Sequence, residues 1–474
     1  MDKPAASFLS GCLQAIGMQN PATSTRVYLA SLGCARNQID SEWMLGRLQR
    51  SGAVLVDEPG QADAIVVNTC SFIEAAADES IDTILQLARY KQTGACRRLI
   101  VTGCLPERYR QEIVGAIPEV DLFLGTGAFD RIAEAVAGTL CASRCILPDP
   151  DTLPVAGADE PRQRALSSMA YLKIAEGCSR RCTYCIIPKL RGRQKSRDAE
   201  DIVAEARQLL HSGVKELVLV SQDTTAYGHD GSGAVDLARL LDSLARLTAD
   251  SRGECAPDEP ADFWIRFLYG HPESIDDAVI QTVAKHANLC EYFDVPIQHA
   301  ADRVLRKMGR RYSRSDLHRL IDRIREQIPE AAIRTTVIVG FPGETEKDFE
   351  TLLRFIEEIR FDHLGCFTYS DAADLASHRL GGHVAEAVAA ERMDAVMYCQ
   401  AGISAGNNRR YLGRSLPVLV ENCVERGLYA CRTAFQAPEV DGTTLVRAGS
   451  LKPGCFQQVR ITEAETYDLM GVPE

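Results

Sequence analysis

Two kinds of hydrophobic pattern, one typical of strands and one of helices, alternate along the N-terminal part of the chain. Short apolar runs of strand length are followed by amphipathic stretches with helical spacing. The apolar runs are Val27–Leu32, Ala53–Val56, Ala64–Asn68, Arg98–Thr102 and Leu122–Leu124. Strands that alternate with helices predict a parallel sheet with helices on both faces. We therefore expect an α/β, flavodoxin-like domain over residues 26–139, with the strand order 2-1-3-4-5.

The same alternation returns over residues 166–400 and then changes. Six strand-like runs, separated by helical patterns, end near Cys178, Asp223, Gly270, His299, Gly340 and Ser370. Six such units predict a partial (β/α)6 barrel with its chemistry at the carboxyl ends of the strands. Residues 401–474 contain the end of a helix and then short apolar stretches broken by Gly and Pro, which predict a small β-barrel. Residues 140–165 show no periodicity and are predicted to be a linker, and residues 1–25 a mobile tail.

Composition narrows the class of protein. The 474 residues are 46% hydrophobic and 25% charged, as in soluble globular proteins. The 17 cysteines are scattered, which favours a reducing compartment and metal ligation over disulfides. No apolar stretch approaches the length of a membrane-spanning helix, so we expect a cytoplasmic protein without membrane contact. The net charge of −12 favours a basic partner and weighs against a nucleic-acid backbone.

Cys178, Cys182 and Cys185 form a C-x3-C-x2-C loop after the first strand of the second domain. A 4Fe-4S cluster is usually held by four thiolates, so three ligands leave one iron open for chemistry. The spacing differs from that of zinc sites, and no further Cys or His lies within the next ten residues. Three unrelated buried thiols are the alternative, which the local density of cysteine disfavours.

Three more cysteines follow strands of the N-terminal domain. Cys34, Cys70 and Cys104 follow the first, third and fourth predicted strands, each at the carboxyl end. These strands are neighbours in the order 2-1-3-4-5, so their loops should converge on the crevice where such folds bind ligands. One strand-end thiol alone is more often a packed side chain. The joint pattern favours a second 4Fe-4S cluster with an open iron.

The cysteine loop, with Tyr184 before its last cysteine, resembles the signature of radical S-adenosylmethionine (SAM) enzymes. Together with the strand-end cysteines and the β-barrel, the chain over residues 26–465 resembles the methylthiotransferases of that class. Stretches that carry this resemblance are Ser31–Asn37, Val67–Ile73, Val101–Glu107, Lys173–Cys178, Pro296–Ala300 and Val339–Glu344. The resemblance implies a methylthiotransferase domain, a radical-SAM barrel and a TRAM domain. It also implies two 4Fe-4S clusters, an auxiliary one on Cys34, Cys70 and Cys104 and a SAM-cleaving one on Cys178, Cys182 and Cys185, with SAM as cosubstrate.

Two branches of this family differ in substrate. One modifies an adenosine of tRNA, and the other the β-carbon of an aspartate in small-subunit ribosomal protein S-twelve. Residues 186–193, 221–228, 124–127 and 438–442 resemble the ribosomal-protein branch, whereas Ala35-Arg36 and Asp371–Ala376 depart from its pattern, which concerns substrate fit only. Residues 415–474 carry five Lys or Arg and eight Asp or Glu. A barrel that binds tRNA should be basic, and an acidic one suits a basic protein.

The ribosomal-protein branch is therefore the function we expect, on S-twelve either free or in the ribosome. Transfer of a methylthio group also implies an electron donor and a source of sulfur. A tRNA methylthiotransferase is one alternative. A non-enzymatic iron–sulfur carrier, which would hold clusters without cleaving SAM, is the other.

Residues at the ends of the barrel strands are the candidate SAM contacts. Tyr184 is expected beside the adenine, and Arg334 on the fifth strand to pair with a carboxylate. The remaining candidates, at the ends of the second, fourth and fifth strands, are Gln222, Asp223, Gln298, His299 and Gly340. Loop-stabilising polar residues are the alternative. We expect no catalytic side chain beyond the clusters, because a homolytic step gains little from proton transfer.

A basic run follows the cysteine loop, with a charged side chain at every second position. Its members are Lys189, Arg191, Arg193, Lys195 and Arg197. Such a run could bind RNA or an acidic segment, but a solvated face is the interpretation we favour.

Overall fold

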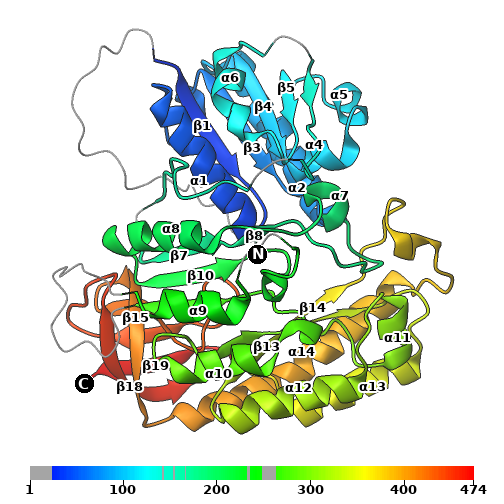
Figure 1. Ribbon diagram of the computed structural model, residues 1–474, viewed down its shortest axis with the longest axis vertical. Helices are drawn as coiled ribbons and strands as arrows, with labels where there is room; N and C mark the ends of the chain where they lie inside the picture. The colour runs from blue at the N-terminus through cyan, green and yellow to red at the C-terminus, as the bar shows by residue number, and fades with distance from the viewer. Residues whose placement is uncertain (1–23, 141–142, 153–154, 166, 232–234, 248–262) are drawn as a thin grey trace. The chain divides into compact units, whose positions relative to one another are not determined.

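The structure is a computed structural model that describes residues 24–140, 143–152, 155–165, 167–231, 235–247 and 263–474 (Figure 1). Most of the tail predicted over residues 1–25 lies outside the described residues. The chain divides into two compact units. The first comprises residues 1–166, 176–179 and 186–195, and the second comprises residues 167–175, 180–185 and 196–474. Within the described ranges, no helix is long and apolar enough to cross a membrane.

A parallel sheet, whose strands β1, β3, β4 and β5 are labelled in Figure 1, forms the centre of the first unit. It has six strands in the order β2-β1-β3-β4-β5-β6. Its strands are β1 (Arg26–Ser31), β2 (Val54–Leu55), β3 (Ala64–Thr69), β4 (Arg98–Gly103), β5 (Leu122–Leu124) and β6 (Cys145–Ile146). The first five have the predicted flavodoxin-like order. Strand β6 comes from the stretch predicted as a linker and pairs with β5. Two residues are too few to give a periodic signal.

Helices cover both faces of this sheet. Helices α1 (Ala35–Arg50) and α6 (Ile132–Ala137) pack on one face, and α2 (Glu74–Ala88) and α5 (Glu112–Ala116) on the other. Every residue of β3 is buried as a result, which explains the apolar run Ala64–Val67 with which the strand begins. The unit also contains α3 (Tyr90–Thr93), α4 (Cys104–Tyr109) and α7 (Ile187–Arg191).

Six parallel strands form the predicted partial barrel of the second unit. They lie in two sheets, β11-β10-β7 and β12-β13-β14, and a bridge between Ile265 and Leu289 links β11 to the segment before β12. The strands are β7 (Met169–Lys173), β10 (Glu216–Val220), β11 (Trp264–Phe267), β12 (Tyr292–Asp294), β13 (Ala332–Val339) and β14 (His363–Thr368). The helices are α8 (Ala199–His211), α9 (Leu237–Ala245), α10 (Asp277–Lys285), α11 (Asp302–Lys307), α12 (Arg314–Gln327), α13 (Glu346–Ile359) and α14 (Glu386–Asn408). Capping boxes at Ser313 and Thr345 fix where α12 and α13 begin.

The C-terminal residues form a closed barrel with the order β15-β16-β17-β19-β18, as predicted. Its strands are β15 (Ser415–Glu425), β16 (Leu428–Thr433), β17 (Thr444–Arg447), β18 (Phe456–Ala464) and β19 (Leu469–Pro473). Closure leaves no free strand edge.

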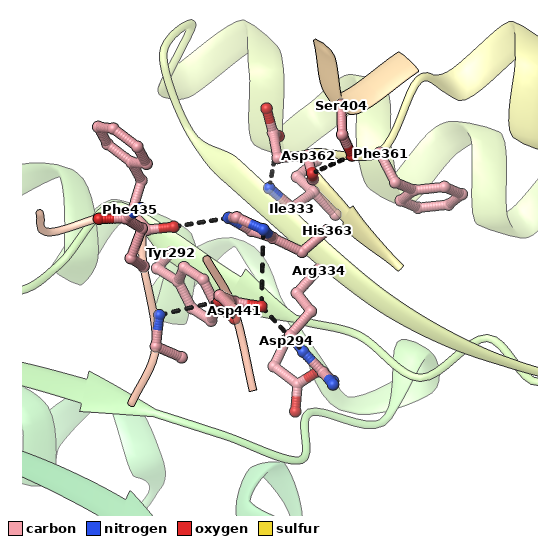
Figure 2. Close-up of polar contacts among 12 residues, drawn as sticks. Tyr292, Asp294, Ile333, Arg334, Phe361, Asp362, His363, Ser404, Phe435 and Asp441 are labelled. Atoms are coloured by element: carbon pink, nitrogen blue, oxygen red, sulfur yellow. Dashed lines mark hydrogen bonds and ion pairs between the residues drawn. The ribbon is translucent and has the colours of Figure 1, made fainter. Parts of the chain in front are cut away.

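Buried contacts join this β-barrel to the partial barrel within the second unit. Asp441, in the connection between β16 and β17, accepts a hydrogen bond from the Tyr292 hydroxyl at 2.6 Å. Its carboxylate also lies 3.4 Å from Nε of Arg334 and 3.6 Å from Nδ1 of His363. Figure 2 shows both contacts as dashed lines. The Trp264 ring packs edge-on against Phe456 of β18, with the ring centroids 4.7 Å apart. The interface is therefore both apolar and charged.

One carboxylate, that of Glu216 at the start of β10, is shared by two arginines at this interface. It accepts from Nε of Arg266 at 2.9 Å and from Nη2 of Arg432, on β16, at 2.5 Å. The three side chains are at most 3% exposed. Burial alone would raise the pKa of Glu216, but Arg432 and Arg266 outweigh it and hold that pKa below its ordinary value. Glu216 is therefore held as an anion where water is excluded.

Candidate functional site

The three strand-end cysteines converge at one edge of the first unit's sheet. Cys34 is the N-cap of α1, three positions after the end of β1; Cys70 directly follows β3; and Cys104 begins α4 directly after β4. Strands β1, β3 and β4 are neighbours, so their carboxyl ends meet. Gly33 has a φ of +94°, and a Cβ there would lie 3.1 Å from Sγ of Cys70, so the glycine leaves room beside that thiol.

Buried amides hold the loops that carry these thiols. The Asn37 side chain donates to the carbonyl oxygens of Leu32 and Thr69, at 3.0 and 2.8 Å, and so ties the loop after β1 to the end of β3. Asn68 in turn donates to the Asn37 carbonyl at 2.9 Å. Both asparagines are at most 1% exposed. The loops that carry Cys34 and Cys70 are thus held by asparagines two or three positions away from those thiols.

The electrostatic environment differs among the three thiols. Burial raises the pKa of Cys104 to about 12 and also raises the pKa of Cys70. Burial acts in the same direction on Cys34, but Arg36 and Arg191 outweigh it and lower the pKa of that thiol. Metal ligation requires the deprotonated form. Positive charge beside these thiols therefore favours the ligating state.

The C-x3-C-x2-C loop begins after β8 (Ala175–Glu176), which pairs with β9 (Lys195–Ser196) beyond the loop. In the first unit, the Cys178 amide donates to the Gly192 carbonyl at 3.0 Å. In the second unit, the Thr183 amide donates to the Met308 carbonyl at 3.0 Å and its hydroxyl to the Lys307 carbonyl at 2.8 Å. Hydrogen bonds from two backbone amides and the Thr183 hydroxyl therefore hold the loop on both sides of its second cysteine.

Gly309 lets the chain after α11 approach this loop closely. Its φ is +78°, and a Cβ there would lie 2.5 Å from the Arg181 carbonyl oxygen and 3.5 Å from Cα of Cys182. Glycine is the residue that meets both requirements, of backbone conformation and of space.

A buried arginine, Arg310, lies beside the second cysteine of the loop. Nη2 of Arg310 donates to the Tyr184 hydroxyl at 2.5 Å, and its guanidinium lies 5.8 Å from the centroids of both Tyr184 and Tyr312. Among the described residues, Nε of Arg310 has no hydrogen-bond partner and no carboxylate pairs with the side chain. A buried cation needs a counter-charge. An anionic cluster on the neighbouring thiolates would supply it.

Asp223, one of the candidate SAM contacts, binds the cysteine loop. Its carboxylate accepts from Nε of Arg180 at 2.7 Å and from the Thr225 hydroxyl at 2.9 Å. Arg180 lies between the first two cysteines and also pairs with Glu273 at 3.0 Å. Asp223 therefore anchors the loop to the end of β10, and Gln222 lies directly before it.

Gln298, His299 and Gly340 lie at the carboxyl ends of barrel strands, as expected. Gln298 has a φ of +66°, a strained value for a residue other than glycine, and such strain is often found at functional sites. His299 is fully buried, and its Nδ1 accepts from the Ala301 amide at 2.9 Å, so Nε2 carries the proton. That Nε2 lies 3.7 Å from Glu344 and has no hydrogen-bond partner among the described residues. Gly340 directly follows β13.

The structure does not bring Arg334 to these residues. It lies near the amino end of β13, about 20 Å along the strand from Gly340 at roughly 3.3 Å per residue. The carboxylates that it contacts are Asp294, at 3.0 Å, and Asp441, at 3.4 Å (Figure 2). Arg334 therefore contributes to the contact between the partial barrel and the β-barrel.

The favoured interpretation of the basic run, a solvated face, is wrong for two of its members. Arg191 and Arg197 are 4% and 3% exposed, whereas the Arg193 side chain is 79% exposed. Arg197 pairs with Asp201 and Glu205, each at 2.7 Å. The alternation of the run is shared by buried and exposed members, so it could not have distinguished Arg191 and Arg197 from Arg193.

Both cysteine sets have a donor composition that suits iron–sulfur clusters. Three thiols and no histidine or carboxylate is the ligand chemistry of a 4Fe-4S cluster with one open iron. Gly33 and Gly309 let neighbouring chain approach the two sets closely, and Arg310 lacks a counter-charge among the described residues. Among the residues that the structure describes, no three Cys, His, Asp or Glu side chains are placed so that together they could hold a metal ion. By the chemistry of their donors, three thiols each, the two sets suit iron–sulfur clusters.

Family models match the chain in three successive parts. Residues 26–125 match the model described as Uncharacterized protein family UPF0004, residues 172–356 the Radical SAM superfamily and residues 412–473 the TRAM domain. Among solved structures, the radical S-adenosylmethionine methyltransferase TsrM of Kitasatospora setae aligns with a TM-score of 0.53 and 15% identity, over 73% of this chain and 75% of that chain. That likeness shows the fold. The class defined by fold and site is a radical SAM enzyme with a TRAM domain.

Relatives by sequence narrow the class. Ribosomal protein uS12 methylthiotransferase RimO of Desulfosudis oleivorans is 54% identical over 94% of this chain and 99% of its own length. The protein of the same name from Clostridioides difficile is 45% identical over 94% of this chain and 98% of its own length. The chain belongs to the RimO family of ribosomal protein uS12 methylthiotransferases. The predicted family and its ribosomal-protein branch are confirmed, in preference to the tRNA branch.

Proposed function

We propose that this chain transfers a methylthio group to the β-carbon of an aspartate in small-subunit ribosomal protein uS12. Membership of the RimO family supports this substrate. The observation that carries the proposal is the presence of two separate cysteine triads. Cys34, Cys70 and Cys104 lie at neighbouring strand ends, and the C-x3-C-x2-C loop supplies the other three thiols. An iron–sulfur carrier would not require both triads.

Each triad would hold one 4Fe-4S cluster. Cys178, Cys182 and Cys185 would bind the cluster that works with SAM, and Cys34, Cys70 and Cys104 the auxiliary one. When bound, these groups supply homolytic C–H activation and the transferred sulfur. Tyr184, Gln222, Asp223, Gln298, His299 and Gly340 are the residues that we propose to line the SAM site. Arg334 is supported instead as a residue that docks the β-barrel.

The protein's own contribution is to position groups and exclude water. Asp223 and Arg180 hold the cysteine loop, and Arg310 fixes the Tyr184 ring through its hydroxyl. No side chain is proposed to transfer a proton, because homolytic steps depend on placement of the reacting atoms. Turnover would draw on an electron donor and a sulfur source, and action on a ribosomal protein would place the chain in the cytoplasm.

The domain boundaries predicted from the sequence remain part of the proposal. The methylthiotransferase domain would span residues 26–139, the linker 140–165, the radical SAM core 166–400, and the helix end with the TRAM domain 401–474. The acidic TRAM domain, with five basic and eight acidic residues over 415–474, would complement a basic ribosomal protein.

Mass spectrometry of a strain that lacks this gene tests the proposed substrate. Peptides of uS12 and tRNA nucleosides are compared with those of the parent strain. We expect one aspartyl peptide to lose a methylthio increment while the tRNA remains unchanged. Loss of a methylthio adenosine with an intact uS12 peptide would overturn the proposal in favour of tRNA. If the purified, reduced protein forms no 5′-deoxyadenosine from SAM, an iron–sulfur carrier is favoured instead.

A further inference from the structure

Arg191 is a buried arginine in the first unit, at the end of α7 and only six positions after Cys185. Its Nη1 lies 2.7 Å from the Asp40 carboxylate and 3.4 Å from that of Glu176. Its Nη2 donates to the Asn37 side-chain oxygen and, at 3.8 Å, to Sγ of Cys104. One guanidinium thus contacts a thiol of the auxiliary set directly.

The partners of Arg191 come from the elements that carry cluster ligands. Asn37 and Asp40 lie on α1, three and six positions after Cys34. Glu176 ends β8, two positions before Cys178. All of these residues, together with Cys104, belong to the first compact unit. Arg191 therefore connects the auxiliary thiols to the strand that leads into the C-x3-C-x2-C loop.

The chemistry of arginine suits this position. Its planar guanidinium has several donors in a fixed arrangement, so it can bind two carboxylates, an amide and a sulfur atom at once, which the single ammonium of lysine cannot do. Hydrogen bonds and nearby charge are among the factors that set the reduction potential of iron–sulfur clusters. A donor to a ligand sulfur also orients that ligand. With Asp40 and Glu176 beside it, the buried charge is compensated.

We infer that Arg191 is a positioning residue: it holds Cys104 in register with the chain entering the C-x3-C-x2-C loop, and its donation to Sγ of Cys104 raises the reduction potential of the auxiliary cluster. The inference rests on the proposed function, because it requires a cluster on Cys34, Cys70 and Cys104. It assigns separate roles to the charge and to the geometry of one side chain. The positive charge raises the reduction potential of the auxiliary cluster. The planar guanidinium, with its fixed donors, holds Cys104 in position.

Two measurements separate these roles. The first is the midpoint potential of the auxiliary cluster, followed by electron paramagnetic resonance in the full chain with Cys178, Cys182 and Cys185 replaced by alanine. The second is the ratio of 5′-deoxyadenosine to methylthiolated uS12 peptide in the chain with all six cysteines. The variants are Arg191→Gln and Arg191→Lys. Arg193→Gln is the matched control, because Arg193 lies two positions away with its side chain 79% exposed.

We expect Arg191→Gln to lower the potential, and Arg191→Lys to keep it near the wild-type value because the charge is retained. Both variants should raise the ratio of 5′-deoxyadenosine to product by about 10- to 100-fold, the usual effect of losing a residue that orients a metal ligand. Arg193→Gln should change neither quantity. If Arg191→Gln binds no auxiliary cluster, the Arg191→Lys variant tests the positioning role instead. A wild-type ratio of 5′-deoxyadenosine to methylthiolated peptide in Arg191→Lys would overturn that role.

A failure of the proposed function would look different. If the alanine-substituted chain with wild-type Arg191 binds no iron, the auxiliary cluster itself does not form and the proposed function fails. If that chain binds a cluster and Arg191→Gln leaves its potential unchanged, the proposed function stands and the effect of the Arg191 charge on the potential is overturned. An equal fall in potential in Arg191→Gln and in Arg193→Gln would also overturn it, because the effect would not depend on contact with Cys104.

Discussion

Replacement of Glu216 by glutamine would remove the negative charge that two buried arginines share. Arg266 would keep its hydrogen bond to the Ala434 carbonyl, at 2.8 Å, and Arg432 its contact with Glu421, at 2.6 Å. Of these groups only Glu421 is charged, and its side chain is 30% exposed. Removal of one partner from a buried ion pair costs about 3–5 kcal/mol, because the remaining charge is left uncompensated. We therefore expect Glu216→Gln to destabilise the contact between the partial barrel and the β-barrel by about that amount.

Trp264 allows this contact to be measured. The chain has two tryptophans, and Trp264 packs against Phe456 of the β-barrel. In a Trp43→Phe background, fluorescence therefore reports the second unit alone. With a urea slope of about 3 kcal/mol/M, a loss of about 3–5 kcal/mol lowers the transition midpoint by about 1–1.7 M. Asp242→Asn is the control, since Asp242 also pairs with two cations, Arg246 and Lys285, but at the surface, where ion pairs contribute little.

The pH dependence gives an independent check. The pKa of Glu216 is held below its ordinary value of 4.5 in the folded protein. Its contribution to stability is therefore present above about pH 4.5 and is lost as the pH falls through the lower, folded-state value. The difference between wild type and Glu216→Gln should shrink over that acidic range. An unchanged midpoint at neutral pH, or a difference that does not depend on pH, would refute this account of the interface.

The thiol sets and the residues beside them give three further expected outcomes. Joint replacement of Cys34, Cys70 and Cys104 by alanine should halve the bound iron and abolish methylthiolation but leave 5′-deoxyadenosine formation; retained product would contradict the auxiliary site. Arg310→Gln should reduce 5′-deoxyadenosine formation by about 10- to 100-fold, whereas Arg311→Gln, at an exposed position, should not. Gly309→Ala should lower thermal stability by more than Gly213→Ala. Both glycines have a positive φ, for which a side chain costs about 1–3 kcal/mol, but a Cβ at Gly213 meets nothing within 4 Å; equal effects would show that the contact with Arg181 is unimportant.

Much of the fold followed from local patterns. In both α/β parts, the alternating strand-like and helical segments were long enough to predict parallel strands covered by helices. In the N-terminal part, the predicted strand order 2-1-3-4-5 then placed Cys34, Cys70 and Cys104 together. The C-x3-C-x2-C loop could be identified from the sequence alone, because its three cysteines lie within eight consecutive residues. Strand β6 was missed because its two residues, Cys145 and Ile146, carry no period.

The pairing of the buried charged residues could not be predicted from local patterns. Glu216 and Arg432 are 216 positions apart, and Arg191 and Asp40 are 151 apart. No local pattern pairs such residues, since their burial depends on packing between distant elements. Arg334 illustrates the same limit: its strand was predicted, but its aspartate partners Asp294 and Asp441 come from β12 and from the β-barrel connection.

The division of the chain into units has a consequence for recombination between relatives. Residues 176–179 and 186–195 belong to the first unit although they lie far beyond its sheet in the sequence. A chimaera joined at residue 166 would combine Arg191 from one parent with Asn37, Asp40 and Cys104 from the other. Exchange of the N-terminal part between homologous enzymes should therefore carry these two short segments with it. In evolution, the same dependence would make the cysteine loop and the N-terminal domain change together rather than as independent modules.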